Sequence, residues 1–161
     1  MGDGTSIRHQ SQFLIGTDNI LRSVRVQIRK VGSPTDNVEC RVMDMDRTTV
    51  IAVSTTSILS SNLSANFQES AFVFNDVVLT PNQRYIIDIR RSSSNSATNH
   101  YEIEANGTNF YPYGQLHYFD GTNWIAYSGC LRFAIQMGFN HEMGKWRLSD
   151  NDYESTSQVD G

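Results

Sequence analysis

Lysine is scarce in this 161-residue chain, which has two lysines beside eleven arginines. Acidic residues outnumber basic ones, and the net charge is −4 at pH 7. Proteins that grip the phosphate backbone of nucleic acid need a concentration of positive charge. We therefore expect that nucleic acid is not the primary partner.

Long hydrophobic runs are missing as well. No apolar stretch approaches the roughly 18–20 residues that cross a bilayer. The opening Met-Gly-Asp-Gly-Thr-Ser lacks both the basic and the apolar segment of an export signal. The sequence therefore predicts no membrane-spanning segment, no secretion signal and no membrane partner.

Cysteine and histidine are few and dispersed. Cys40 and Cys130 stand 90 residues apart, which matches no metal-ligand or redox spacing, and two buried thiols are favoured over a disulfide. The four histidines form no metal-binding pair, and there is no glycine-rich phosphate loop and no Gly-x-Ser-x-Gly elbow. These absences predict a protein that is not an enzyme and holds no cofactor.

What the chain does have is hydrophobic alternation with a period of two. Val24, Val26 and Ile28 share one face of a strand over 21–31, and a second alternating strand covers 38–43. The Gly, Pro and Asn between these two strands predict a turn, and therefore a hairpin. About nine such strands and no long amphipathic helix predict an all-β fold, an antiparallel jelly-roll-like β-sandwich.

The composition divides the chain into three parts. We expect a flexible N-terminal arm over 1–11, the sandwich over 12–139, and an acidic C-terminal tail over 140–161 that carries a net charge of −3. Trp146 and Leu148 are the hydrophobic anchors of that tail and the candidate partner-docking residues. Docking on the same domain and docking on a neighbouring subunit both remain open.

A calcium site is a weaker alternative to a metal-free chain. Asp44 and Asp46 place two carboxylates on the same side of an extended segment, and Ca²⁺ takes oxygen ligands from such loops. Asp-rich turns also form through hydrogen bonds between side chain and backbone, without an ion. We favour the interpretation without a metal.

Aromatic residues cluster near the C-terminal end of the predicted sandwich. Exposed rings stack on the apolar faces of sugars while Asn, Gln and Arg bind the hydroxyl groups. Tyr111, Tyr113 and Trp124 stand next to turn residues, so they are the candidate glycan platform. Packing in the core or at a subunit interface is the favoured alternative for the whole cluster, which comprises Phe110, Tyr111, Tyr113, Tyr118, Phe119, Trp124 and Tyr127.

The order of segments over roughly 12–138 resembles a loose family of jelly-roll β-sandwich domains. These domains are similar to carbohydrate-binding modules and occur in secreted multidomain proteins and in virion proteins of tailed phages. The likeness lies in hydrophobic residues and turns that define a fold. It departs from the family in having no tryptophan before the Phe72 strand. The matching segments are 21–34, Phe72-Val-Phe74, Val77-Val-Leu79-Thr-Pro81, Tyr85-Ile-Ile87, Tyr111-Pro-Tyr-Gly-Gln115, Asn123-Trp124 and Leu131-Arg-Phe133.

The resemblance and the flanking arms imply two functions without catalysis. The first is a virion structural protein, a capsid decoration (cement) or tail-associated subunit that is assembled in the host cytoplasm. It would form homo-oligomers and bind other virion or capsid subunits through its sandwich and arms. The alternative is an extracellular carbohydrate-binding module that recognises a cell-surface or matrix glycan. A hydrolase or lyase on the same scaffold has only fold precedent behind it.

Overall fold

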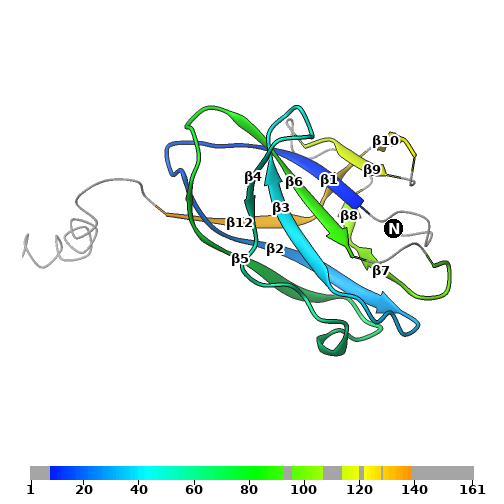
Figure 1. The fold of residues 1–161 in the computed structure, drawn as a ribbon. Coiled ribbons are helices and arrows are strands. Elements are labelled where there is room, and N and C mark those ends of the chain that lie inside the picture. Colours follow the sequence, from blue (N-terminus) through cyan, green and yellow to red (C-terminus); the bar gives the residue numbers. More distant parts are fainter. Residues whose placement is uncertain (1–7, 93–95, 107–113, 120–121, 128, 139–161) are drawn as a thin grey trace, which may run out of the picture.

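Two antiparallel sheets face each other across an apolar core in the computed structural model, which describes residues 8–92, 96–106, 114–119, 122–127 and 129–138 (Figure 1). The predicted all-β, antiparallel β-sandwich is confirmed. The described residues include no α-helix, and therefore no helix of the length and hydrophobicity that a membrane crossing requires.

One sheet has six strands, and the other is built around the long strand β2. In the six-stranded sheet the order is β10 (Trp124–Tyr127), β9 (Leu116–Phe119), β1 (Arg8–Leu14), β6 (Arg84–Arg91), β3 (Val38–Met43) and β4 (Val50–Val53). In the facing sheet, β2 (Ile20–Val31) has β5 (Gln68–Val78) on one side. On its other side β2 pairs first with β12 (Phe133–Gly138), over residues 20–26, and further along with β7 (His100–Ile103), over residues 28–31. The short strands β8 (Ala105–Asn106) and β11 (Cys130–Leu131) pair with each other.

The core forms where the alternating faces of the two sheets meet. Val24, Val26 and Ile28 are buried, as the alternation predicts. Ile87 and Ile89 of β6 enter the same core from the six-stranded sheet. Each side chain of this kind stabilises the fold by about 1.5–3 kcal/mol when it is fully buried. Cys40 and Cys130 are buried free thiols, and burial raises the pKa of the Cys40 thiol well above 9.

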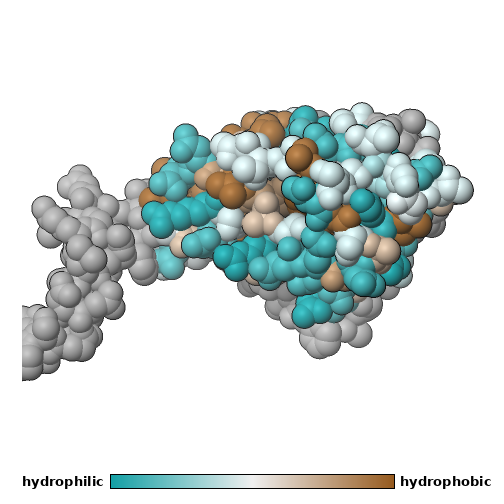
Figure 2. Space-filling model, turned by 90° about the horizontal axis from the view of Figure 1, so that it is seen from below, coloured by the Kyte–Doolittle hydropathy of each residue, from teal (hydrophilic) through white to brown (hydrophobic). Residues whose placement is uncertain are grey.

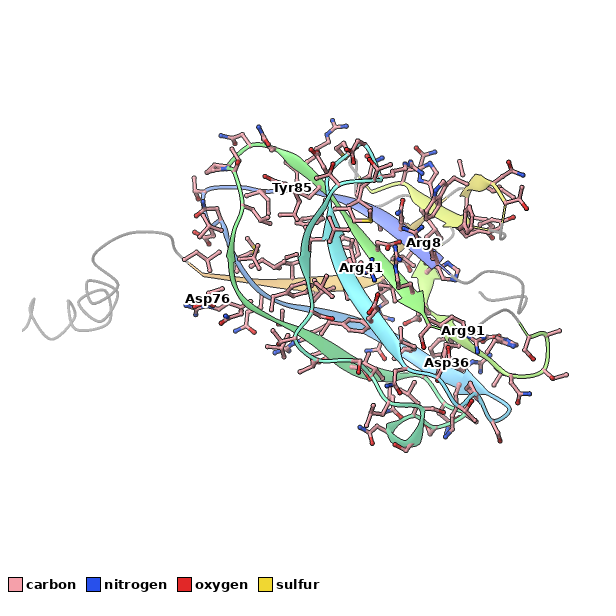
Figure 3. All side chains as sticks on the ribbon, viewed as in Figure 1. Arg8, Asp36, Arg41, Asp76, Tyr85 and Arg91 are labelled. Atoms are coloured by element: carbon pink, nitrogen blue, oxygen red, sulfur yellow. The ribbon has the colours of Figure 1, made fainter. Side chains whose placement is uncertain are left out.

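The predicted hairpin between residues 21–31 and 38–43 is wrong, because these strands lie in different sheets. Residues 32–37 carry the chain across the sandwich instead. Gly32 has φ +67°, and a Cβ there would lie 2.1 Å from the Thr98 carbonyl oxygen, so glycine is required at this crossing. Asp36 and Arg91 then form a buried two-pronged ion pair that attaches the crossing to β6 (Figure 3).

Short local elements complete the sandwich. Asp120-Gly121 between two aromatic-rich segments predicts a hairpin, and β9 and β10 pair antiparallel as expected, with Trp124 opposite Phe119. A single 3₁₀ turn covers Ser60–Asn62. Strand β1 begins at Arg8, so residues 8–11 of the expected arm belong to the sheet. Each of the nine predicted strands has a counterpart among the twelve that the structure describes. Two predicted strands are each divided into two shorter ones, β7 with β8 and β11 with β12, and β1 was not predicted.

The surface is polar, with hydrophobic residues in small groups. On the face seen from below in Figure 2, brown hydrophobic residues are separated by hydrophilic ones. One region differs from this pattern: Val50, Ile51 and Val53 of the edge strand β4 are all exposed. Neighbouring Val73 of β5 is exposed too.

Candidate functional site

The outer face of the six-stranded sheet carries buried polar residues, which a solvent-facing sheet surface does not need. Ile87 and Ile89 of β6 point into the core, so Asp88 between them points outward. Its exposure is nevertheless 0%, and that of Gln10 on the neighbouring strand β1 is 1%. Something therefore covers this part of the outer face.

Two arginines and one amide surround the Asp88 carboxylate. Arg8 donates from Nε to Oδ1 at 3.2 Å and from Nη2 to Oδ2 at 3.1 Å. Arg90 donates from Nε to Oδ2 at 2.9 Å, and Gln10 donates from Nε2 to Oδ1 at 3.1 Å. A buried carboxylate needs this many donors, because each lost contact with water must be replaced.

Aromatic rings cover the cluster at its β9–β10 side. The Arg8 guanidinium carbon lies 4.8 Å from the ring centroid of Trp124 and 6.0 Å from that of Phe119. The two rings are 5.2 Å apart and tilted by 47°. Arg8 therefore combines an ion pair on β6 with cation–π contacts on the hairpin. On the far side, Arg41 of β3 donates from Nε to Glu39 Oε1 at 2.8 Å.

The turn between β3 and β4 is fixed by Asp46. Its carboxylate accepts hydrogen bonds from the Thr49 hydroxyl at 2.5 Å and from the backbone N–H groups of Thr49 and Thr48 at 2.8 Å each. These bonds, that of the Thr49 hydroxyl first, hold the pKa of Asp46 far below its usual 3.8. Arg47 at the tip of this turn has φ 62°, a left-handed conformation.

The same turn bears on the calcium alternative. Asp44 accepts a hydrogen bond from the backbone N–H of Met45 at 2.6 Å, and Asp46 binds its own loop as described above. Both carboxylates thus act as turn-forming groups. Among the residues that the structure describes, no group of three or more His, Cys, Asp or Glu side chains could hold a metal ion.

From this turn Arg47 extends to the β9–β10 hairpin. Its Nη2 lies 3.0 Å from His117 Nε2, and its guanidinium carbon lies 5.7 Å from the Trp124 ring centroid. His117 Nδ1 is 3.4 Å from the Gln115 carbonyl oxygen, so we assign the proton to Nδ1 and the acceptor role to Nε2. Partial burial and the charge of Arg47 lower the pKa of His117 below 6.5.

We define the binding face as this outer cluster: Arg8, Gln10, Glu39, Arg41, Arg47, Asp88, Arg90, His117, Phe119 and Trp124. Trp124, predicted as a platform residue, lies in it, half-buried against Arg8, Arg47 and Phe119. Tyr111 and Tyr113 lie outside the described residues, and so do Trp146 and Leu148.

The sequence analysis did not identify the arginines of the binding face as candidate site residues. Arg8 meets Asp88 across a separation of 80 positions, and Arg47 meets His117 across 70. The one local signal is the pairing of Asp88 with Arg90 two residues later, which indicates a charged outer row on β6.

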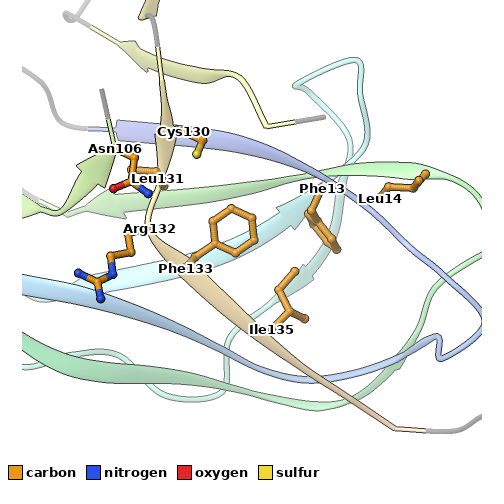
Figure 4. A pocket seen from close by; sticks show the side chains of 8 residues that line it. All are labelled: Phe13, Leu14, Asn106, Cys130, Leu131, Arg132, Phe133 and Ile135. Carbon is orange, nitrogen blue, oxygen red and sulfur yellow. The ribbon is translucent and has the colours of Figure 1, made fainter. Parts of the chain in front are cut away.

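A pocket of about 390 Å³ opens elsewhere, between β1 and the β11–β12 segment (Figure 4). Phe13, Phe133 and Ile135 provide much of its lining. Its one charged residue, Arg132, is paired with Glu104 at 3.0 Å. Among the described residues the pocket therefore lacks the converging polar groups that select a polar ligand, and the binding face is the stronger candidate.

Comparisons with known protein families, with curated proteins and with solved structures find no match for this chain. Its function is therefore inferred from the binding face and from the sequence.

Removing the buried carboxylate should cost far more stability than removing an exposed one. We expect Asp88→Ala to lower the free energy of unfolding by about 3–5 kcal/mol, because the largely buried Arg8 would lose its carboxylate and Arg90 would keep only the more distant Glu39, at 3.9 Å. The control Glu69→Ala breaks an exposed pair with Arg25 and should cost about 1 kcal/mol or less. Urea denaturation of both variants measures the difference, and equal losses would contradict the role assigned to Asp88.

His117 should titrate below the usual histidine range. Its neighbours on β1 and β10, Gln10 and Ala126, are uncharged, so Arg47 is the charge that acts on it. We expect NMR titration to give an imidazole pKa below 6.5, and a value closer to 6.5 in Arg47→Met. Because the unfolded chain binds this proton more readily, stability should decline as the pH falls through about 6.5. An unchanged pKa in Arg47→Met would refute the contact.

Proposed function

We propose that this chain is a non-catalytic module that binds a saccharide on the binding face. The observation that carries the proposal is the meeting of two partly exposed rings, Trp124 and Phe119, with a fixed row of arginines. Rings contact the apolar C–H surfaces of sugars, and charged donors and acceptors bind the hydroxyl groups. Arg41 and Glu39 are partly exposed and supply such groups on the same face, on the far side of the Asp88 cluster from the rings.

Binding without catalysis fits the state of the carboxylates. A glycosidase needs two carboxyl groups that reach the scissile bond from either side. Asp88 is fully buried beneath Arg8 and Arg90, so a bound sugar would not touch it. We propose that the module is displayed on a virion, in line with the resemblance of its segments to domains of tailed-phage virion proteins, with an extracellular location as the alternative.

Tryptophan fluorescence offers a direct test of saccharide binding. The chain has two tryptophans, so Trp146→Phe leaves Trp124 as the sole reporter. We expect a saccharide that a glycan array identifies to shift the emission of this variant. Trp124→Ala should weaken binding about tenfold or more, equivalent to about 1.4 kcal/mol.

The matched control is Tyr127→Ala, because Tyr127 is an exposed aromatic residue on the opposite side of β10. It should leave binding unchanged. An array without hits, measured on protein with a folded circular dichroism spectrum, would reject the proposal.

The edge strand β4 favours a second candidate, assembly with other copies of the chain. Val50, Ile51 and Val53 are exposed, and the strand has no charged residue or proline that would discourage pairing. An uncharged edge is self-complementary, so we propose that β4 pairs antiparallel with β4 of a second copy, as a homo-oligomeric decoration subunit would.

Solution mass tests this second candidate. We expect light scattering to show a dimer or a larger assembly of the full chain, and Ile51→Lys to shift it to the monomer. Val78→Lys, at another exposed valine on β5, should leave the mass unchanged. A full chain that stays monomeric at high concentration would reject pairing through β4.

A further inference from the structure

Arg47 is the arginine of the binding face whose charge is not balanced by a carboxylate. Arg8 and Arg90 pair with Asp88, and Arg41 pairs with Glu39. Within the described part of the chain, no carboxylate lies within 4 Å of the Arg47 guanidinium. Arginines elsewhere in the sandwich are paired as well: Arg22 with Asp76, Arg25 with Glu69, Arg29 with Glu102, Arg91 with Asp36 and Arg132 with Glu104.

The β3–β4 turn holds Arg47 in this position. The Arg47 N–H donates to the Asp44 carbonyl at 3.1 Å, and the Asp44 N–H donates to the Thr49 carbonyl at 2.9 Å. The hydrogen bonds to the Asp46 carboxylate close the turn from the other side. Arg47 takes the left-handed conformation that these bonds impose, a conformation that residues with a Cβ rarely adopt. The backbone of Arg47 is therefore fixed by the hydrogen bonds of the turn, and its guanidinium extends from this point to His117.

The contacts of Arg47 leave most of its donors available. A guanidinium has five N–H groups, and His117 Nε2 accepts from one nitrogen, Nη2. His117 is itself anchored through Nδ1 to the Gln115 carbonyl, so it orients Arg47 without neutralising its charge. The N–H groups that His117 does not use lie in one plane and can donate side by side to two oxygens of a carboxylate or of a sulfate group.

The carboxylates near this point are already engaged. Asp88 and Glu39 are occupied by the arginines described above, and Asp44 and Asp46 accept hydrogen bonds from the backbone of their own turn. An arriving anion would therefore meet donors of Arg47 that no carboxylate of the face occupies. The Trp124 ring, 5.7 Å from the guanidinium carbon, lies where the body of a sugar would follow its acidic group.

We infer that the ligand of the binding face is an acidic saccharide, one that carries a carboxylate or a sulfate ester, and that Arg47 binds this acidic group. The inference rests on the proposed function and adds the ligand class to it. The Trp124 ring would contact acidic and neutral sugars alike. Arg47 would raise the affinity only for sugars that carry an acidic group.

The experiment compares three probes by calorimetry: a galacturonate hexasaccharide, a heparin hexasaccharide and neutral cellohexaose. We expect the full chain to bind at least one acidic probe about tenfold or more tightly than the neutral one, with a preference that declines as salt is added. Arg47→Met should remove the preference and keep the residual affinity for cellohexaose. Arg47→Lys, which keeps the charge but not the fork, should retain part of the preference.

Arg25→Met is the matched control, because it removes the same charge from the outer face of the other sheet. It should leave the preference intact. Binding of cellohexaose as tightly as the acidic probes would overturn the inference while the proposed function stands. An acidic preference that survives Arg47→Met would overturn the role of Arg47. No binding of either acidic probe by the folded chain would overturn the inference, whereas the glycan array decides the proposed function separately.

Discussion

The charge of Asp88, fully buried on the outer side of a sheet, is the constraint from which the rest of the binding face follows. An ionised carboxylate without water requires donors at fixed positions, and Arg8, Arg90 and Gln10 supply them from two neighbouring strands. Arg8 cannot leave Asp88 without exposing a buried charge, so its position beneath Trp124 is fixed as well. The ion cluster thereby orders the β9–β10 hairpin, which forms the edge of the sheet.

Rigidity of this kind favours binding. Side chains that are already held in place lose little conformational entropy when a ligand arrives, and preorganised donors therefore gain affinity. The same contacts keep the oxygens of the buried Asp88 carboxylate occupied by donors of the protein and out of reach of a bound ligand. Arg47 completes this arrangement from the opposite end of the sheet, since the β3–β4 turn projects it across the face to His117.

The alternation of apolar residues was sufficient to predict the sandwich and most of its strands. It failed for β1, because the residues that alternate inward from that strand begin with His9 and Ser11, and the sequence therefore shows no hydrophobic row there. It also failed for the segment over 32–37, since Gly, Pro and Asn mark a tight hairpin and a crossing between sheets equally well. Tertiary contacts decide whether such a segment forms a hairpin or a crossing. Here the contact is the ion pair of Asp36 with Arg91, which lies 55 positions away in the sequence.

The binding face was less predictable than the fold for the same physical reason. Its contacts join residues that are distant in sequence, and single charged residues on outer strand positions look like ordinary solvated ones. Trp124 was recognisable, since aromatic residues near turns are uncommon enough to stand out. The arginines around Trp124 could be recognised as part of one site only from the pairing of β1 with β6 and β9, which the sequence does not reveal.

The rings of the binding face and the pairing strand β4 lie at opposite edges of one sheet, and this arrangement makes the two candidate functions compatible. Strand β4 forms one edge and β10 the other, so pairing through β4 leaves the rings of Trp124 and Phe119 uncovered. Antiparallel pairing of two identical edges relates the copies by a two-fold axis perpendicular to the sheet, which keeps both outer faces on the same side. An assembly of this kind would present two binding faces in one direction. Two weak sites held together gain avidity without any new contact, so assembly through β4 would strengthen attachment to a surface that carries many copies of the same saccharide.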